Sequence, residues 1–204
     1  MKEKIVVLCG GEGSGKSTIM KRVAKEQKGN QIVLSREPGG SLRAEEIRAY
    51  LFSEKAKDLS PDAQFDMMWG ARKDHVHKTI VPALHDGKHL LIDRFDCCTY
   101  AYQIFGEQMH ELKWLFQTQR EYLLKIIPPP TYIWLNLDPV LGLMRKRRVE
   151  DRNLFDDKDV EFHKRVRAGY GEFMGIGRVV ELDASLSEEE VWKNFKTAFE
   201  HAVA

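Results

Sequence analysis

Short apolar runs alternate along this chain with longer stretches in which apolar residues recur at helical spacing. The apolar runs, rich in β-branched residues, lie at residues 5–9, 31–34, 90–93, 131–137 and 179–182. Each run is continuous rather than alternating, which is typical of strands buried on both faces of a sheet. Helical spacing extends over residues 17–27, 41–53, 61–86, 100–127, 159–173 and 187–203.

The alternation of strands and helices predicts an α/β fold with a central, mainly parallel sheet of about five strands and helices on both sides. Three consecutive prolines at residues 128–130 end a helical stretch before a strand, so they form a stiff spacer and not a domain boundary. No internal repeat or low-complexity tract interrupts the pattern. We therefore expect a single domain over residues 1–204.

Composition excludes several classes of protein. Of the 204 residues, 43% are hydrophobic, so the chain can bury a sizeable core. Its 32 Lys and Arg residues and 31 Asp and Glu residues give a net charge of +1, which argues against a dedicated nucleic-acid-binding module. The apolar run at residues 5–9 is too short for a membrane span or a secretory signal.

The three cysteines bear on the compartment. Cys9, Cys97 and Cys98 are odd in number, and the adjacent pair is poorly placed for an ordinary disulfide. A reducing compartment is favoured, so we expect a cytoplasmic protein with neither a membrane nor a nucleic acid as partner. No spacing of Cys and His residues fits a zinc site.

A glycine-rich segment follows the first predicted strand. Residues 10–17 read GGEGSGKS, which matches the phosphate-binding motif G-x-x-x-x-G-K-[ST] directly before a helical stretch. In this motif the Lys16 ammonium reaches the β- and γ-phosphates, and the Ser17 hydroxyl ligates Mg²⁺. The alternative, a glycine-rich turn with an incidental lysine, does not explain why strand and helix flank the motif in register. The predicted nucleotide-binding residues are Gly10, Gly11, Glu12, Gly13, Ser14, Gly15, Lys16, Ser17 and Thr18.

Glu12 is unusual because a carboxylate inside an anion-binding loop repels the ligand. We expect it to accept a hydrogen bond from a sugar hydroxyl of a second substrate, or to help hold the metal. The plain alternative is a glutamate that faces solvent.

Further motifs follow this loop in order. They are REPGG at residues 36–40, AR at 71–72 with His75, DRF at 93–95, AYQ at 101–103, DR at 151–152 and RVR at 165–167 with Tyr170. Together with the loop, they resemble the thymidylate kinase family of nucleoside monophosphate kinases over essentially the whole chain. The resemblance implies a P-loop kinase fold, ATP- and Mg²⁺-dependent phosphorylation of dTMP to dTDP, and a homodimer.

Phosphoryl transfer brings phosphate charges together, so the site needs cations more than a base. The resemblance implies that Arg94 bridges the acceptor phosphate towards the transferred group and that Asp93 holds the metal through water. Without the phosphate-binding loop, a strand-end cap or a surface ion pair would explain these two residues equally well. The predicted metal ligands are Ser17 and Asp93.

Five cations lie within residues 145–152. A solvated helix face or a nucleic-acid patch would also give such a run. The resemblance implies a mobile lid, about residues 142–157, that closes over ATP and supplies an arginine. Some family members carry that arginine at the position of Gly13, so here the lid must supply it. The predicted catalytic residues are Lys16, Arg94, Arg147, Arg148 and Arg152.

Met68 and Arg72 are four residues apart and share one helix face. The family usually has Phe at the first position, stacked on thymine, while the arginine meets a base carbonyl. A thioether packs on a ring more loosely, and Tyr102 matches a tyrosine that favours deoxyribose. The predicted acceptor-binding residues are Glu12, Arg36, Pro38, Arg48, Met68, Arg72, Arg94, Cys98, Thr99, Tyr102 and Gln103.

The leading hypothesis is therefore a dTMP kinase, and three alternatives stay open. Met68 encourages a broader deoxynucleoside monophosphate kinase. A nucleotide-binding protein without catalysis would have no need for Lys16, Asp93 and Arg94 together. A nucleic-acid-stimulated NTPase would use the basic run but fits poorly with a net charge of +1.

Overall fold

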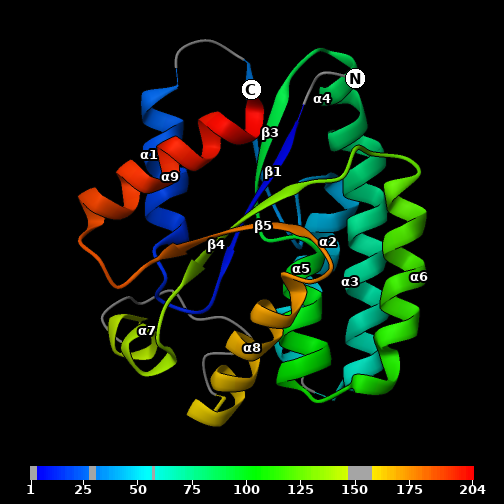
Figure 1. The fold of residues 1–204 in the computed structure, drawn as a ribbon. Coiled ribbons are helices and arrows are strands. Elements are labelled where there is room, and N and C mark those ends of the chain that lie inside the picture. Colours follow the sequence, from blue (N-terminus) through cyan, green and yellow to red (C-terminus); the bar gives the residue numbers. More distant parts are fainter. Residues whose placement is uncertain (1–3, 28–30, 57, 147–157) are drawn as a thin grey trace.

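The fold is built on a parallel sheet of five strands in the order β2-β3-β1-β4-β5, in a computed structural model that describes residues 4–27, 31–56, 58–146 and 158–204 (Figure 1). The strands are β1 (Ile5–Gly10), β2 (Ile32–Arg36), β3 (His89–Asp93), β4 (Thr131–Asn136) and β5 (Arg178–Asp183). Every neighbouring pair is parallel. The predicted strands are confirmed, with ends that differ by two residues at most.

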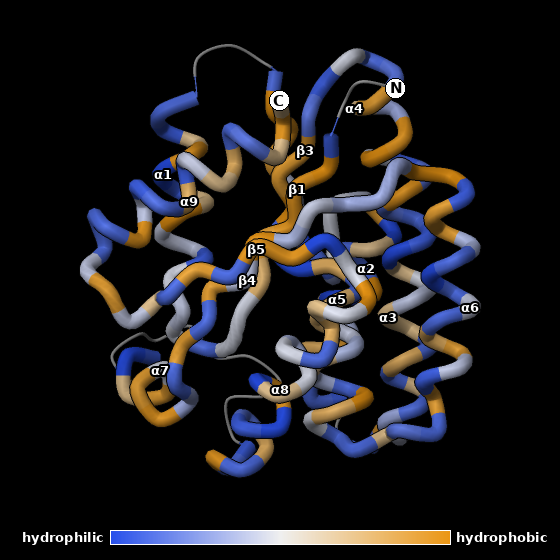
Figure 2. Tube along the Cα trace, viewed as in Figure 1, coloured by the Kyte–Doolittle hydropathy of each residue, from blue (hydrophilic) through white to orange (hydrophobic). Residues whose placement is uncertain are grey.

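Alternate residues of β1 face opposite sides of the sheet, and both sides are buried. Ile5, Val7 and Cys9 belong to one hydrophobic core, whereas Val6 and Leu8 belong to the other. This two-sided burial explains the continuous apolar runs of the central strands (Figure 2). The edge strands β2 and β5 are only partly buried.

Helices cover both faces of the sheet. They are α1 (Lys16–Glu26), α2 (Leu42–Leu51), α3 (Pro61–His75), α4 (Val81–His85), α5 (Asp96–Thr99), α6 (Lys113–Leu124), α7 (Pro139–Lys146), α8 (Val160–Phe173) and α9 (Glu188–Val203). The apolar faces of α1 and α9 pack into one core, and those of α3, α6 and α8 into the other. Among the described residues, no helix is long and apolar enough to cross a lipid bilayer.

Two predicted helical stretches differ from expectation. Residues 61–86 stay helical, but Val76–Ile80 form a π-helix before α4, whose Pro82 lacks the N–H that an α-helix would use. The long helical region predicted at residues 100–127 is helical but interrupted. Its helix already begins at Asp96 and continues as a π-helix to Gly106, and Gln108 then breaks it with a left-handed backbone at φ 60°.

The carboxyl ends of all five parallel strands lie at one edge of the sheet. The segment after β1 leads into α1, the end of β3 leads into α5, and β4 is followed by α7. Ligands of open α/β sheets bind at this edge. The motifs found in the sequence therefore converge there.

Candidate active site

The phosphate-binding loop joins β1 to α1, and three of its glycines, Gly10, Gly13 and Gly15, have positive φ angles that suit no other residue well. Gly10 has φ 149°, and a side chain there would place its Cβ 2.6 Å from the carbonyl oxygen of Leu135. Gly15 has φ 95° and caps α1 without any side-chain hydrogen bond to the first turn. The N–H groups at the start of α1 are thus left for an anionic ligand.

Lys16 folds back into this loop. Its Nζ donates to the carbonyl oxygens of Gly10 (3.0 Å) and Gly11 (2.8 Å) and to Ser14 Oγ (3.2 Å). Burial lowers the pKa of Lys16, and the positive charge of Arg94 lowers it further. The ammonium is therefore poorly solvated, and an incoming phosphate would give it a strong charged partner.

Glu12 is buried rather than facing solvent, so the plain alternative for this residue is wrong. Its Oε1 accepts hydrogen bonds from Arg94 Nη2 (3.0 Å) and from the Tyr102 hydroxyl (2.9 Å). Burial alone would raise the pKa of Glu12, but the charges of Arg94 and Lys16 lower it to about 2. The carboxylate is therefore ionised and holds Arg94 in place.

Most of the predicted site residues line one cavity of about 550 Å³ at this edge of the sheet. They are Glu12, Gly13, Ser14, Gly15, Lys16, Ser17, Thr18, Pro38, Arg48, Met68, Arg72, Asp93, Arg94, Cys98, Thr99, Tyr102 and Gln103. Gly10 and Gly11 lie behind the cavity and contribute carbonyl groups to Lys16. Residues separated by up to 91 positions in the sequence, Glu12 and Gln103, thus meet around one space.

Arg36 is the predicted acceptor residue that does not line this cavity. Its side chain is 54% exposed, and its Nη2 donates to Glu45 Oε2 at 3.0 Å. The lid arginines Arg147, Arg148 and Arg152 lie outside the described residues. Of the predicted lid, residues 142–146 form the end of α7.

The structure adds residues to this cavity that the sequence prediction missed. They are Lys21, Glu37, Phe52 and Phe95, whereas Arg145 and Lys146, which also line it, belong to the basic run of the predicted lid. Glu37 and Phe95 lie inside the quoted motifs, so the motifs themselves were a sufficient signal for them. Phe52 follows α2 with no motif around it, and only the fold places it at the cavity.

Arg72 is held at the end of the cavity nearest α3. Its Nε donates to Glu37 Oε2 (2.8 Å), and its Nη2 donates to Thr99 Oγ1 (3.1 Å). The guanidinium also lies over the rings of Trp69, at 4.5 Å, and Phe95, at 5.3 Å. Its exposed fraction is 3%, so this charge is almost completely removed from water.

A second cavity, of about 500 Å³, lies on the other side of the loop and shares Gly13, Ser14, Gly15, Thr18 and Arg145 with the first. Its other walls come from α1, from the segment after β5 and from α9. The sequence prediction contains no residue specific to this cavity, because no motif marks these walls.

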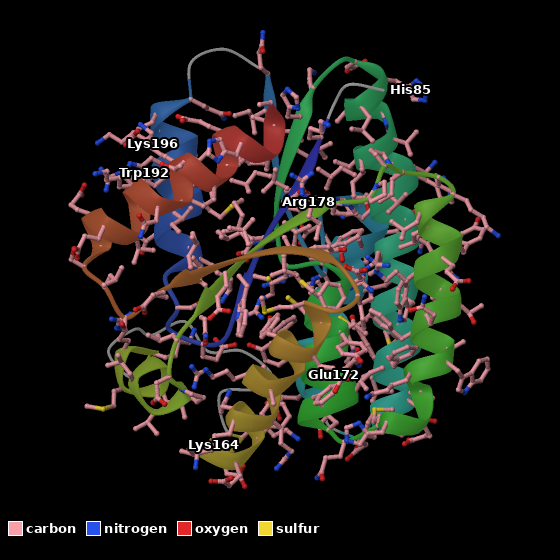
Figure 3. The ribbon with its side chains drawn as sticks, viewed as in Figure 1. His85, Lys164, Glu172, Arg178, Trp192 and Lys196 are labelled. Carbon is pink, nitrogen blue, oxygen red and sulfur yellow. The ribbon has the colours of Figure 1, made fainter. Side chains whose placement is uncertain are left out.

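Two arginines shape the second cavity. Arg145 Nη1 donates to the carbonyl oxygen of Ala184 at 2.8 Å, which ties α7 to the segment after β5. The Arg22 guanidinium of α1 lies 4.6 Å from the centroid of the Trp192 ring. Trp192 is labelled on α9 in Figure 3. These contacts form a site with an indole and backbone groups in its wall, a setting in which a planar base can pack.

The first cavity contains oxygen ligands of the kind that a magnesium ion prefers. Asp93 Oδ1 is buried and has no hydrogen-bond partner among the described residues, and Ser17 lines the same cavity. The described part of the chain contains no cluster of three or more His, Cys, Asp or Glu residues around a common point. Mg²⁺ typically binds one or two carboxylates together with substrate phosphates and water, so these residues fit it.

Comparison with known proteins gives this arrangement a family. A family model described as thymidylate kinase matches residues 9–194. The chain belongs to the thymidylate kinase family. The thymidylate kinase of Acinetobacter baylyi is 36% identical over 200 residues, which cover 96% of this chain and 96% of that protein. The thymidylate kinase of Teredinibacter turnerae is 34% identical over 177 residues, which cover 83% of each.

A solved structure shares the thymidylate kinase fold. The crystal structure of thymidylate kinase from Ehrlichia chaffeensis matches with a TM-score of 0.75 at 23% identity, over 97% of this chain and 98% of that one. This match confirms the predicted α/β fold with its five-stranded parallel sheet. The family match covers the phosphate-binding loop and both cavities up to Trp192.

Proposed function

We propose that this chain is a thymidylate kinase that transfers the γ-phosphoryl group of ATP to dTMP and forms dTDP and ADP. One observation carries the proposal: two cavities of similar volume meet at a single phosphate-binding loop. A nucleotide in each cavity would direct its phosphates to the same place. That arrangement suits a transfer between two nucleotides better than hydrolysis of one.

The donor nucleotide would occupy the second cavity. Its base would pack near Trp192, and its phosphates would follow the loop to the start of α1. Lys16 would move from its carbonyl partners to the phosphates, while Ser17 and Asp93 would hold Mg²⁺. The bound ion would supply charge neutralisation between the β- and γ-phosphates.

The acceptor nucleotide would occupy the first cavity with its phosphate near Arg48 and Arg94. Burial lowers the pKa of Arg48, and the charges of Arg36 and Arg94 lower it further. These guanidinium groups repel one another, so an acceptor phosphate between them would be bound strongly. Although Arg36 lies outside the cavity wall, its charge thus acts on the site.

In the transfer, an oxygen of the acceptor phosphate attacks the γ-phosphorus in line, and the bond from that phosphorus to the β,γ-bridging oxygen breaks. The acceptor oxygen is already anionic, so no general base is required. Glu12 is suited to binding and not to proton transfer, because its pKa of about 2 keeps it ionised. We place Arg94, between Glu12 and the acceptor phosphate, as a cation that acts on the transferred group together with Lys16.

The test is an ADP-release assay across a panel of nucleoside monophosphates. We expect dTMP to give the highest kcat/KM. Activity with another acceptor but none with dTMP would overturn the substrate assignment.

Lys16→Ala tests catalysis against simple nucleotide binding. We expect turnover to fall about a hundredfold or more with the fold retained, because a buried cation at the transferred group is lost. Lys25→Ala, an exposed lysine on the same helix, should leave turnover unchanged. Equal activity of both variants would contradict a kinase mechanism at this loop.

We also propose that two copies form a homodimer in the cytoplasm. Trp114 and Tyr122 lie on α6 with exposed fractions of 68% and 48%, and large exposed aromatic side chains favour a protein contact. The three cysteines are free thiols, as expected in a reducing compartment.

A further inference from the structure

A chain of buried hydrogen bonds joins the end of β2 to α3 behind the acceptor cavity. Ser35 Oγ lies 2.7 Å from His75 Nε2, and His75 Nδ1 lies 2.9 Å from Glu37 Oε1. The other carboxylate oxygen, Glu37 Oε2, accepts from Arg72 Nε at 2.8 Å. The exposed fractions of Glu37, Arg72 and His75 are 4%, 3% and 0%.

The chemistry of these groups sets the direction of the two bonds to Glu37. A carboxylate beside an arginine is an acceptor at both oxygens, so His75 Nδ1 must carry a hydrogen and donate it to Glu37. The Ser35 hydroxyl can either donate to His75 Nε2 or accept from it, so this ring nitrogen is bonded in either case. Both nitrogens of the His75 ring and both oxygens of the Glu37 carboxylate therefore have partners.

The backbone of the REPGG motif is shaped around this network. Gly40 has φ 82°, and a Cβ at this position would collide with Ser35 Oγ and with the His75 ring. Thr79 Oγ1 donates to the carbonyl oxygen of Gly40 at 2.5 Å, which fastens the loop to the π-helix after α3. Gly40 of the motif and His75 of α3 therefore pack directly against each other.

The result is a guanidinium with almost no freedom. Glu37 accepts from Arg72 Nε, Thr99 accepts from Arg72 Nη2, and the guanidinium lies over two aromatic rings. Arg72 Nη1 is buried and has no hydrogen-bond partner among the described residues, although Arg72 lines the acceptor cavity. This nitrogen can only donate, so its complement on a ligand is an acceptor atom such as a keto oxygen.

We infer that Glu37 and His75 are positioning residues that hold Arg72 so that its free N–H meets a keto oxygen of the acceptor base. The inference rests on the proposed function: the family resemblance already gives Arg72 a base carbonyl as its partner, and the new element is the pair of residues that holds Arg72 in place for it. A base with an amino group at the same place would face Arg72 with a second donor. The mismatch would leave a buried donor unpaired, which binding sites penalise strongly.

Glu37→Gln tests this role. A glutamine has the size of glutamate but no negative charge, so the bond to Arg72 Nε loses its ionic part and holds the guanidinium less firmly. We expect the KM for dTMP to rise about tenfold, with the KM for ATP within about twofold of the wild type. We also expect the preference for dTMP over dCMP to fall, because a looser Arg72 distinguishes keto from amino groups less well.

His75 gives a second pair of variants, which keeps the test valid if Glu37→Gln fails to fold. His75→Asn keeps a side-chain N–H near the position of Nδ1, whereas His75→Phe removes it. We expect His75→Asn to retain more of the dTMP preference than His75→Phe does. Equal loss of preference in both variants would overturn the role of the bond to Glu37.

Phe195→Leu is the matched control, because Phe195 is buried in the core on the opposite face of the sheet. It should lower the melting temperature without changing either acceptor KM or the base preference. A Glu37→Gln variant that changed only the melting temperature, as this control does, would show a purely structural role and overturn the inference. The activity of the wild type with dTMP tests the proposed function. The ratio of the variant KM to the wild-type KM tests the inference, and it can be measured with any acceptor that the wild type phosphorylates.

Discussion

Glu12 carries the most strongly shifted carboxylate around the phosphate-binding loop. Its pKa falls from about 4.5 to about 2 despite burial, because Arg94 and Lys16 lie close by. A carboxylate with a lowered pKa in the folded state stabilises the fold above the unfolded pKa. That contribution is lost as the pH falls from about 4.5 through about 2.

Glu12→Gln should therefore lower the free energy of unfolding by about 3 kcal/mol at pH 7. The difference from the wild type should narrow as the pH falls from 4.5 towards 2, since the wild-type carboxylate then becomes neutral as well. Urea unfolding at several pH values measures this. Glu200→Gln, at an exposed site on α9, should show no such trend, and a gap that stays constant with pH would refute the ionic explanation.

Met68→Phe should lower the KM for dTMP about two- to tenfold, because a flat ring offers a stacking face that the thioether lacks. The residue is half-buried and lines the acceptor cavity. Steady-state kinetics with dTMP and dCMP measure the effect. Met67→Phe is the control, since Met67 does not line the cavity. An unchanged or weaker affinity in Met68→Phe would mean that Met68 does not lie under the base.

At this scale the sequence predicts residues that lie inside motifs at strand ends, because the carboxyl ends of parallel strands must meet. Asp93 and Arg94 are such cases. Arg36 shows the limit: it also ends a strand, but Glu45 of α2 competes for its guanidinium. No pattern in the sequence reveals which of the two partners, the glutamate or a ligand, the side chain reaches.

Between elements, the closest approach at the active site joins α7 to the phosphate-binding loop. A Cβ on Gly13 would collide with the carbonyl group of Gly142, and a Cβ on Gly142 would collide with the carbonyl oxygen of Glu12. The helix that leads into the predicted lid thus packs backbone to backbone against the loop. This close contact also explains why a side chain as large as arginine does not fit at position 13 in this chain.

Gly142→Ala should push α7 away from the loop, lower the melting temperature and raise the KM for ATP several-fold. Gly171→Ala, on α8, provides the matched control because its added Cβ meets nothing within 4 Å. The control should stabilise the protein by about 0.5–1 kcal/mol through helix propensity. Normal ATP kinetics in Gly142→Ala would show that the contact is not needed for donor binding.

The strands could be predicted almost to the residue, because central strands with two buried faces leave an unmistakable apolar run. The ends of helices were harder to predict where an unusual backbone conformation interrupts the helix. Apolar spacing continues through residues 107–109, so it does not reveal the left-handed backbone of Gln108. The second cavity was missed for a different reason: Arg22 and Trp192 meet only because α1 and α9 pack on the same face of the sheet.

For the whole molecule, the exposed face of α6 defines the proposed contact between two copies. Trp114→Glu should convert a homodimer to a monomer, because a charge at the centre of an apolar contact is costly to desolvate. Sedimentation equilibrium over a range of concentrations measures the mass. Lys196→Glu, on the exposed side of α9, should leave the mass unchanged. A wild-type chain that is monomeric at all concentrations would refute the dimer.

The shared wall of the two cavities, residues 13–15, links the occupants thermodynamically. A nucleotide in either cavity would contact this segment, so binding in one cavity can change the affinity of the other. The resulting cooperativity must be reciprocal: if donor enhances the affinity for acceptor by some factor, acceptor enhances the affinity for donor equally. Where that factor exceeds one, the coupling favours the state with both nucleotides bound. In this state the acceptor phosphate, and not water, lies beside the donor.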